Sequence, residues 1–172
     1  MGDPRKSRKT YSTPAHPWQK ARIEEEKVLM REYGLKNKKE IWKMNTLVKT
    51  FADQIKDSVT ATSAQAKIET EQLITKLKNL ALIKEDSTMD DILGLTTKNV
   101  LERRLQTLVF RKGMAKSIDQ ARQFITHGHI KIGESKVTRP SFLVSKAEED
   151  HISFIARSAL ASIEHPERGE AT

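Results

Sequence analysis

Three stretches in the first half of the chain space their apolar residues three and four positions apart, which is the spacing of an amphipathic helix. The first predicted helix covers residues 18–33, with Pro17 in its first turn and Gly34 as its C-terminal stop. The second covers residues 39–57, and the third follows the loop at 58–64. We expect the second and third helices to pack as an antiparallel pair whose apolar positions are Ile41, Met44, Leu47, Val48, Phe51, Ile55, Ile68, Ile74, Leu77, Leu80 and Ala81.

A further helix is predicted to begin in residues 96–113, "TTKNVLERRLQTLVFRKG". On a helical wheel its apolar stripe consists of Leu101, Leu105, Leu108 and Val109. The opposite side carries Arg103, Arg104, Thr107 and Arg111, which the pattern therefore predicts to be exposed. Replacing the three arginines with alanine is accordingly expected to leave the fold intact.

The pattern changes its period within residues 116–133, "KSIDQARQFITHGHIKIG". Ser117 followed by Gln120 is a capping-box pattern that begins a helix, and Gly128 suits the left-handed residue that ends one. Beyond Gly128 the apolar residues alternate, which is typical of a strand. A tight hairpin turn is expected at 133–134, and further strands are expected at 135–138, 142–144 and 151–154.

Together these patterns predict an α+β fold. It consists of an N-terminal helical domain with a basic extended tail, followed by a small helix–hairpin module in which two helices pack against a short antiparallel sheet. The predicted divisions are a basic N-terminal extension at 1–17, the helical domain at 18–97, the module at 98–155, and a C-terminal helix with an acidic tail at 156–172.

The charge of the chain is strongly positive, with 31 Lys and Arg against 23 Asp and Glu and a formal net charge of +8. Ten bases and three acids lie between Lys98 and Pro140, so nearly the whole excess falls on the predicted module. Such a concentration indicates a polyanionic partner, most often nucleic acid. The tail adds a second basic group, Arg5, Lys6, Arg8 and Lys9, which we expect to order on a phosphate backbone.

Several classes of protein and site are disfavoured by the composition. There is no cysteine, which excludes disulfides and thiolate zinc sites, and no apolar run approaches a membrane span. His127 and His129 straddle a predicted helix end without a third ligand nearby, so no metal is expected. No nucleotide-binding or hydrolase motif occurs. We expect a soluble intracellular, non-enzymatic protein without cofactor, small-molecule substrate or membrane partner.

The expected ligand is a folded RNA recognised by its shape and backbone, because no pair of exposed aromatics for stacking on single strands is evident. The mechanism requires that the arginines of the module be free of the chain's own carboxylates. The alternative explanations are solvation alone for Lys112 and orientation of its loop for Arg122. The candidate RNA-binding residues are Arg103, Arg104, Gln106, Arg111, Lys112, Lys116, Ser117, Arg122, Gln123, His127, Lys131 and Arg139, with Arg5, Lys6, Arg8 and Lys9 in the tail.

Residues 101–144 closely resemble the RNA-binding module named after small-subunit ribosomal protein S-four. The elements that carry the resemblance are Arg104-Leu105, Ala115 to Ser117, Ala121-Arg122 to Gly128, Ile130 to Val137 and Pro140-Ser141. With the N-terminal "YSTPAHPWQKARIEEE" and the helical segment, the chain is similar over nearly its full length to the archaeal and eukaryotic branch of that ribosomal family. Its hairpin turn is Gly-Glu where the family usually has Asn-Gly, and the cysteine zinc cluster of some bacterial members is absent.

The resemblance implies a structural component of the small ribosomal subunit in the cytoplasm. It implies direct binding to small-subunit ribosomal RNA at a multi-helix junction early in assembly, and contacts with neighbouring ribosomal proteins. It also implies a place near the channel through which messenger RNA enters, and so possible contact with messenger RNA. Two alternatives are an RNA-binding stress or RNA-modification factor with the same module, and a DNA-binding helix-turn-helix protein that uses Ser117 to His127.

Overall fold

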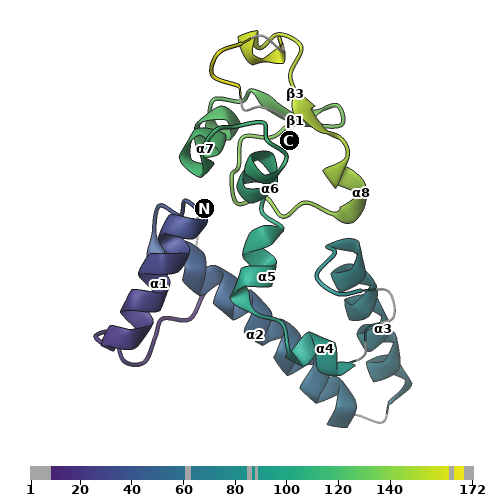
Figure 1. Ribbon diagram of the computed structural model, residues 1–172. Helices are drawn as coiled ribbons and strands as arrows, with labels where there is room; N and C mark the ends of the chain where they lie inside the picture. Colours follow the sequence, from purple (N-terminus) through teal and green to yellow (C-terminus); the bar gives the residue numbers. More distant parts are fainter. Residues whose placement is uncertain (1–8, 61–62, 85–86, 88, 163–164, 169–172) are drawn as a thin grey trace, which may run out of the picture.

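The helices of the first half and a small sheet in the second half form two adjoining parts of the molecule in a computed structural model (Figure 1). The structure describes residues 9–60, 63–84, 87, 89–162 and 165–168. One hydrophobic core lies among the helices up to Leu101, and a second begins at Leu105 and includes one face of the sheet. The described helices include none that is long and apolar enough to span a membrane.

The first helix, α1 (Lys20–Glu32), ends where the sequence predicts, because Gly34 takes a left-handed φ of +55°. The backbone N–H of Leu35 then donates to the carbonyl of Met30 at 2.9 Å, which closes the helix end. The helix begins two residues later than predicted. Pro17 precedes it, and the Arg22 guanidinium donates to the Pro17 carbonyl at 2.8 Å.

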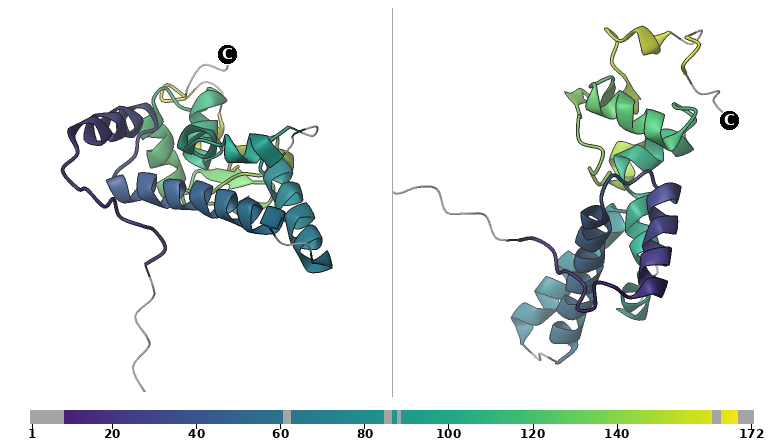
Figure 2. Two further views of the ribbon diagram at one scale, coloured as in Figure 1. Left: turned by 90° about the horizontal axis from the view of Figure 1, so that it is seen from below. Right: turned by 90° about the vertical axis from the view of Figure 1, so that its left-hand side faces the viewer.

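The two predicted helices that follow are α2 (Lys38–Thr60) and α3 (Ala64–Asn79). They contact each other and diverge in a V shape, while α1 lies beside the first half of α2 (Figure 2). The apolar stripe of α2 is buried as predicted, through Ile41, Met44, Phe51 and Ile55. The prediction for Ile68 is wrong, since the buried face of α3 runs through Ala66, Thr70, Leu73 and Leu77 and leaves Ile68 48% exposed.

The helix predicted to begin in residues 96–113 is broken in the structure. A short helix α4 (Met89–Leu93) precedes it, and the segment itself forms α5 (Thr97–Glu102) and α6 (Leu105–Arg111). Arg104 is extended between them, because its neighbours bond to a distant segment: Leu105 N–H donates to the Phe142 carbonyl at 2.8 Å. The break resets the helical phase, and Thr107, predicted to be exposed, is buried.

The helix–hairpin part follows the sequence pattern closely. Helix α7 (Ile118–Thr126) has Ser117 as its N-cap and ends at Gly128, whose φ is +76°. Strands β1 (Ile130–Ile132) and β2 (Ser135–Lys136) form a two-residue hairpin with Gly133 at φ +59°. Because Gly133 alone of the two turn residues has a positive φ, the turn belongs to the type that places glycine first.

The sheet has three strands in the order β2-β1-β3, all antiparallel, with β3 spanning Ile152–Phe154. A strand at 142–144 was expected in this sheet. That segment instead makes a single bridge, Arg104 to Leu143, and leads into α8 (Lys146–Glu149). In the described part of 156–172, the predicted C-terminal helix is only a 3₁₀ turn, η1 (Ala159–Ala161).

Replacing Ser117 with alanine is expected to lower the free energy of unfolding by about 1 kcal/mol. The Ser117 hydroxyl oxygen accepts the backbone N–H of Gln120 at 3.1 Å, a donor that the helix itself cannot satisfy. Urea denaturation would measure the loss, and Ser117→Asp, which keeps an acceptor, should restore most of it. Ser135→Ala at an exposed strand position is the control, and an equal loss in that variant would contradict the capping role.

Candidate nucleic-acid interface

Four of the module's arginines predicted to face RNA are paired with the chain's own carboxylates, whereas Arg139 is exposed and has no ion pair among the described residues. Arg103 donates to Glu149 at 2.7 Å and to the Val144 carbonyl at 3.0 Å, so its side chain is only 12% exposed. Arg111, on the last turn of α6, pairs with Glu102 at 3.0 Å but stays 58% exposed. Of the module's arginines, only Arg139 is therefore free of carboxylates among the described residues, and of the four paired arginines only Arg111 keeps much of its surface open.

The prediction that Arg104 is exposed is wrong, because its side chain is fully buried. The break between α5 and α6 turns it toward α2, where its Nη2 donates to Oε2 of Glu40 at 2.5 Å. Gln106 is also buried, and its amide donates to the carbonyls of Gly34 at 3.1 Å and Ile118 at 3.0 Å. The wheel placed Arg104 on the exposed side because it assumed one unbroken helix.

Five residues form a polar contact between the two parts of the molecule, which we call the junction cluster: Gly34, Glu40, Arg104, Gln106 and Arg122. Arg122, on α7, donates to the Gly34 carbonyl at 3.1 Å and to Glu40 Oε1 at 3.3 Å. One carboxylate on α2 therefore holds two guanidinium groups of the module. These contacts fix how the helices of the first half sit against the helix–hairpin part.

The charge of Glu40 follows from this setting. Burial acts to raise the pKa of Glu40, but hydrogen bonds and the positive charges of Arg104 and Arg122 outweigh it, so that pKa lies below its ordinary value. Glu40 is therefore ionised at neutral pH. With two guanidinium groups on one carboxylate, the junction cluster keeps a net positive charge.

Three further candidates interact with the backbone or cap a helix. Lys112 donates to the backbone carbonyl of Glu149, and Lys116 to that of Pro166 at 2.6 Å. Ser117, although exposed, caps α7. These bonds use part of the donor capacity of each ammonium group but do not neutralise its charge.

The hairpin carries cations with no carboxylate partner among the described residues. Lys131 and Lys136 are direct cross-strand partners on the face opposite Ile130 and Ile132. Two like charges opposite each other destabilise a strand pair, so their placement favours an anionic ligand. The exposed side chains of Gln123, His127 and Arg139 come from α7 and the segment after the hairpin.

The structure adds cations that the sequence pattern did not single out. Lys36, Lys39 and Lys43 are exposed at and before the start of α2, and Lys43 lines a cavity of about 200 Å³ with Arg122 and Ser141. The signal was visible as the basic run "KNKKEIWK", which was interpreted only for its apolar spacing. The sequence analysis also missed Trp18, which is 91% exposed beside the start of α1.

The tail is described only from residue 9 onward. Lys9 is exposed, and its ammonium lies 4.9 Å from the centre of the Tyr11 ring. Ser12 N–H donates to Thr46 Oγ1 of α2 at 3.0 Å, so this part of the tail packs on the helices. Arg5, Lys6 and Arg8 lie outside the described residues.

The two histidines that flank Gly128 have contacts of their own. The rings of His127 and His129 stack with centres 6.4 Å apart, and His129 Nδ1 lies 2.9 Å from the Ser158 hydroxyl. In the part of the chain that the structure describes, no three His, Asp or Glu residues group as metal ligands would.

Comparison with known proteins gives matches over the module and over the whole chain. Residues 103–152 match the family model of the S4 domain. Over 172 residues the chain is 52% identical to the small ribosomal subunit protein uS4 of Methanococcus aeolicus, covering 99% of this chain and 97% of the relative. It is 49% identical over 173 residues to the protein of the same name from Methanococcus maripaludis, covering 100% and 97% respectively.

Proposed function

The chain belongs to the archaeal-type branch of the uS4 family of small ribosomal subunit proteins, and from this premise we propose that it is a structural, non-enzymatic component of the small subunit that binds small-subunit ribosomal RNA. The observation that carries the proposal is the identity to uS4 proteins over almost the whole chain, including the helices outside the S4 domain. The protein is accordingly a component of cytoplasmic ribosomes.

The binding mechanism is electrostatic docking of a preformed surface on folded RNA. The hairpin lysines Lys131 and Lys136 meet phosphates on one side, while Lys43 and Arg122 border the cavity at the junction cluster. Each phosphate that a base neutralises releases counterions, which makes binding tight at low salt. The junction cluster supports this mechanism because it fixes the two cationic regions relative to each other.

The finer part of the proposal rests on the family resemblance. The protein binds the RNA early in assembly, at a multi-helix junction, and lies near the channel through which messenger RNA enters. Neighbouring small-subunit proteins contact it there, and messenger RNA is a further candidate partner. The tail residues Arg5, Lys6 and Arg8 are proposed as RNA contacts on charge alone.

Two alternatives have less support. A stress or RNA-modification factor would share only the module, whereas the identity covers the helical half as well. A helix-turn-helix function needs the N-terminal end of α7 to enter a DNA groove. Side chains at that end are held by the C-terminal segment instead, because Lys116 and Gln120 donate to the carbonyls of Pro166 and Glu167 at 2.6 and 2.8 Å.

Replacing Lys131 and Lys136 together with glutamine is expected to weaken binding to structured RNA and to flatten its salt dependence. The slope of log affinity against log salt should fall by about 0.9 for each phosphate that is no longer neutralised. Filter binding at several salt concentrations would measure it. The matched control is Lys56→Gln with Lys67→Gln, which removes the same charge from exposed positions on α2 and α3. If both pairs changed the slope equally, the hairpin would not be a specific part of the RNA surface.

Sedimentation tests the function itself. The endogenous protein should travel with the small ribosomal subunit through a high-salt wash. A protein that remained at the top of the gradient, or that bound duplex DNA as tightly as structured RNA in competition, would overturn the proposal.

A further inference from the structure

The far end of the helical half has the opposite charge from the rest of the protein. Residues 51–60, 64–71 and 89–93 contain two lysines and six carboxylates, within a chain whose net charge is +8. The carboxylates of Asp53, Asp57 and Glu71 make no ion pair with any described residue, whereas most arginines of the module are paired. A phosphate backbone would be repelled from this region.

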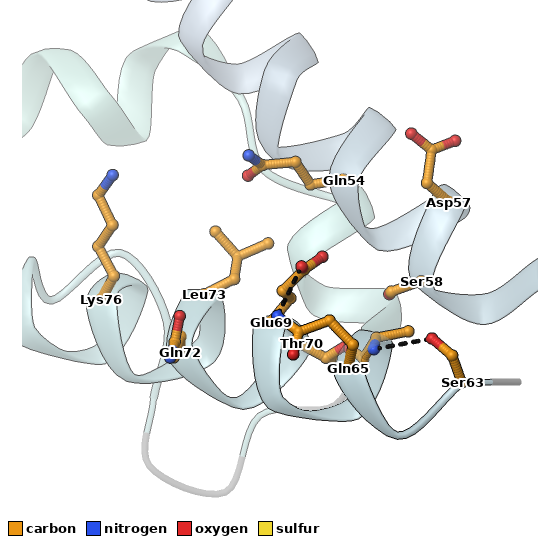
Figure 3. A pocket seen from close by; sticks show the side chains of 11 residues that line it. Gln54, Asp57, Ser58, Ser63, Gln65, Glu69, Thr70, Gln72, Leu73 and Lys76 are labelled. Carbon is orange, nitrogen blue, oxygen red and sulfur yellow. Dashed lines mark hydrogen bonds between the residues drawn. The ribbon is translucent and has the colours of Figure 1, made fainter. Parts of the chain in front are cut away.

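A groove lies in this acidic region, where α3 diverges from α2 (Figure 3). It encloses about 540 Å³, and we call it the α2–α3 groove. Leu73 lies at its base and is 8% exposed. Its polar lining includes Gln54 and Asp57 from α2, with Glu69, Gln72 and Lys76 from α3.

The lining offers unused hydrogen-bonding groups. The amide groups of Gln54 and Gln72 make no side-chain hydrogen bond to any described residue, and each can both donate and accept. Among the described residues, Glu69 accepts only the Gln65 amide, at 3.0 Å. Lys76 also lines the groove, with its ammonium 5.8 Å from the centre of the Phe51 ring, so the lining holds two carboxylates and one ammonium.

Exposed apolar side chains occur on the same two helices. Val59, near the end of α2, is 65% exposed, and Ile68, on the first half of α3, is 48% exposed. Carboxylates, free amides and apolar side chains together match a polypeptide that carries positive charge. RNA offers neither the charge nor the apolar side chains for this surface.

We propose that the α2–α3 groove is the docking site for a positively charged, extended segment of a neighbouring protein of the small subunit. Asp57 and Glu69 pair with its lysine or arginine side chains, and Gln54 and Gln72 bond to its main chain. This inference rests on the proposed function, because the partner is a component of the same particle. It assigns protein binding to the acidic end and RNA binding to the basic module.

A photo-crosslinker can show whether protein or RNA occupies the α2–α3 groove. Gln72→p-benzoyl-phenylalanine would be placed in the groove, and Gln123→p-benzoyl-phenylalanine on the exposed face of α7 serves as the matched position. Both proteins are incorporated into small subunits, which are purified by sedimentation and irradiated. The product at position 72 should resist ribonuclease and should contain a peptide of net positive charge from a second protein, while position 123 should give a product sensitive to ribonuclease.

Charge removal supplies a second readout. Asp57→Asn with Glu69→Gln should lower the crosslink yield at position 72 roughly threefold or more, as expected for two partly exposed ion pairs. The control pair Asp150→Asn with Glu25→Gln, at exposed positions on other surfaces, should leave the yield unchanged. The inference would be overturned if position 72 gave an RNA product, an acidic peptide or no product while position 123 reacted. It would also be overturned if the two charge pairs changed the yield equally. None of these outcomes would overturn the proposed function. If the protein did not join the subunit at all, the proposed function would fail with it.

Discussion

Replacing Glu40 with glutamine is expected to lower the free energy of unfolding by about 3–5 kcal/mol, the range for removing one partner of a buried ion pair. Arg104 is fully buried, and its only carboxylate partner among the described residues is Glu40. The substitution would leave that guanidinium inside the protein without a negative charge. Arg122 would lose the same partner but is 26% exposed and can turn toward water.

The matched control is Glu32→Gln, which removes a carboxylate paired with Lys98 at 3.7 Å on the surface. That pair is more than a third exposed on both sides, so the loss should stay below about 1 kcal/mol. Urea denaturation at neutral pH would compare the two variants. Equal losses would show that the Glu40 pair is no more important than an ordinary surface contact.

The contribution of Glu40 to the free energy of unfolding should also depend on pH. Its pKa is lower in the folded protein than in the unfolded chain, so the unfolded state binds the proton first as the pH falls. The stability that ionised Glu40 contributes is present above the unfolded pKa of about 4.3 and is lost as the pH drops through the folded value. The stability difference between the native protein and Glu40→Gln should therefore shrink below about pH 4.

Gly34→Ala is the second substitution with a large expected effect, a loss of about 2–4 kcal/mol. A side chain at φ +55° is strained, and a Cβ there would lie 2.7 Å from Gln106 Nε2 and 2.9 Å from Ile118 Cγ2. Both neighbours belong to buried or packed parts of the module. The substitution would push the helical half away from the module as well as strain the end of α1.

Gly133→Ala provides the comparison, because its φ of +59° is nearly the same but a Cβ would meet nothing within 4 Å. Only the backbone strain should remain there, at about 1–2 kcal/mol. Thermal denaturation of both variants separates backbone strain from crowding at the junction cluster. If Gly133→Ala were as harmful as Gly34→Ala, crowding would not contribute.

Local patterns in the sequence predicted the local structure well. Ser117, Gly128 and the Gly133 turn act through their own backbone and near neighbours, so residues close in sequence were sufficient to place α7 and the hairpin. The break at Arg104 depends instead on hydrogen bonds to Phe142 and Val144, far along the chain. A helical wheel contains no information about such contacts, and it therefore placed a buried arginine on the surface.

The same limit applies to the candidate RNA surface. Arginine type and position indicated binding, but Glu40 and Glu149, which neutralise Arg104 and Arg103, come from elements remote in sequence. Lys36, Lys39 and Lys43 were not predicted as RNA contacts, because the sequence around them was interpreted only as the apolar pattern of a helix. Charge counts identified the ligand class, while the assignment of individual side chains required the packing of α2 against the module.

Because the junction cluster and neighbouring carboxylates occupy most of the module's arginines, its open positive charge is provided largely by ammonium groups. A guanidinium demands a planar acceptor in a set orientation, whereas an ammonium tolerates many directions of approach. Apart from the exposed Arg111 and Arg139, the angle of a single contact then contributes little to selectivity among RNAs. The main contribution comes from how many lysines one particular RNA contour can reach at the same time.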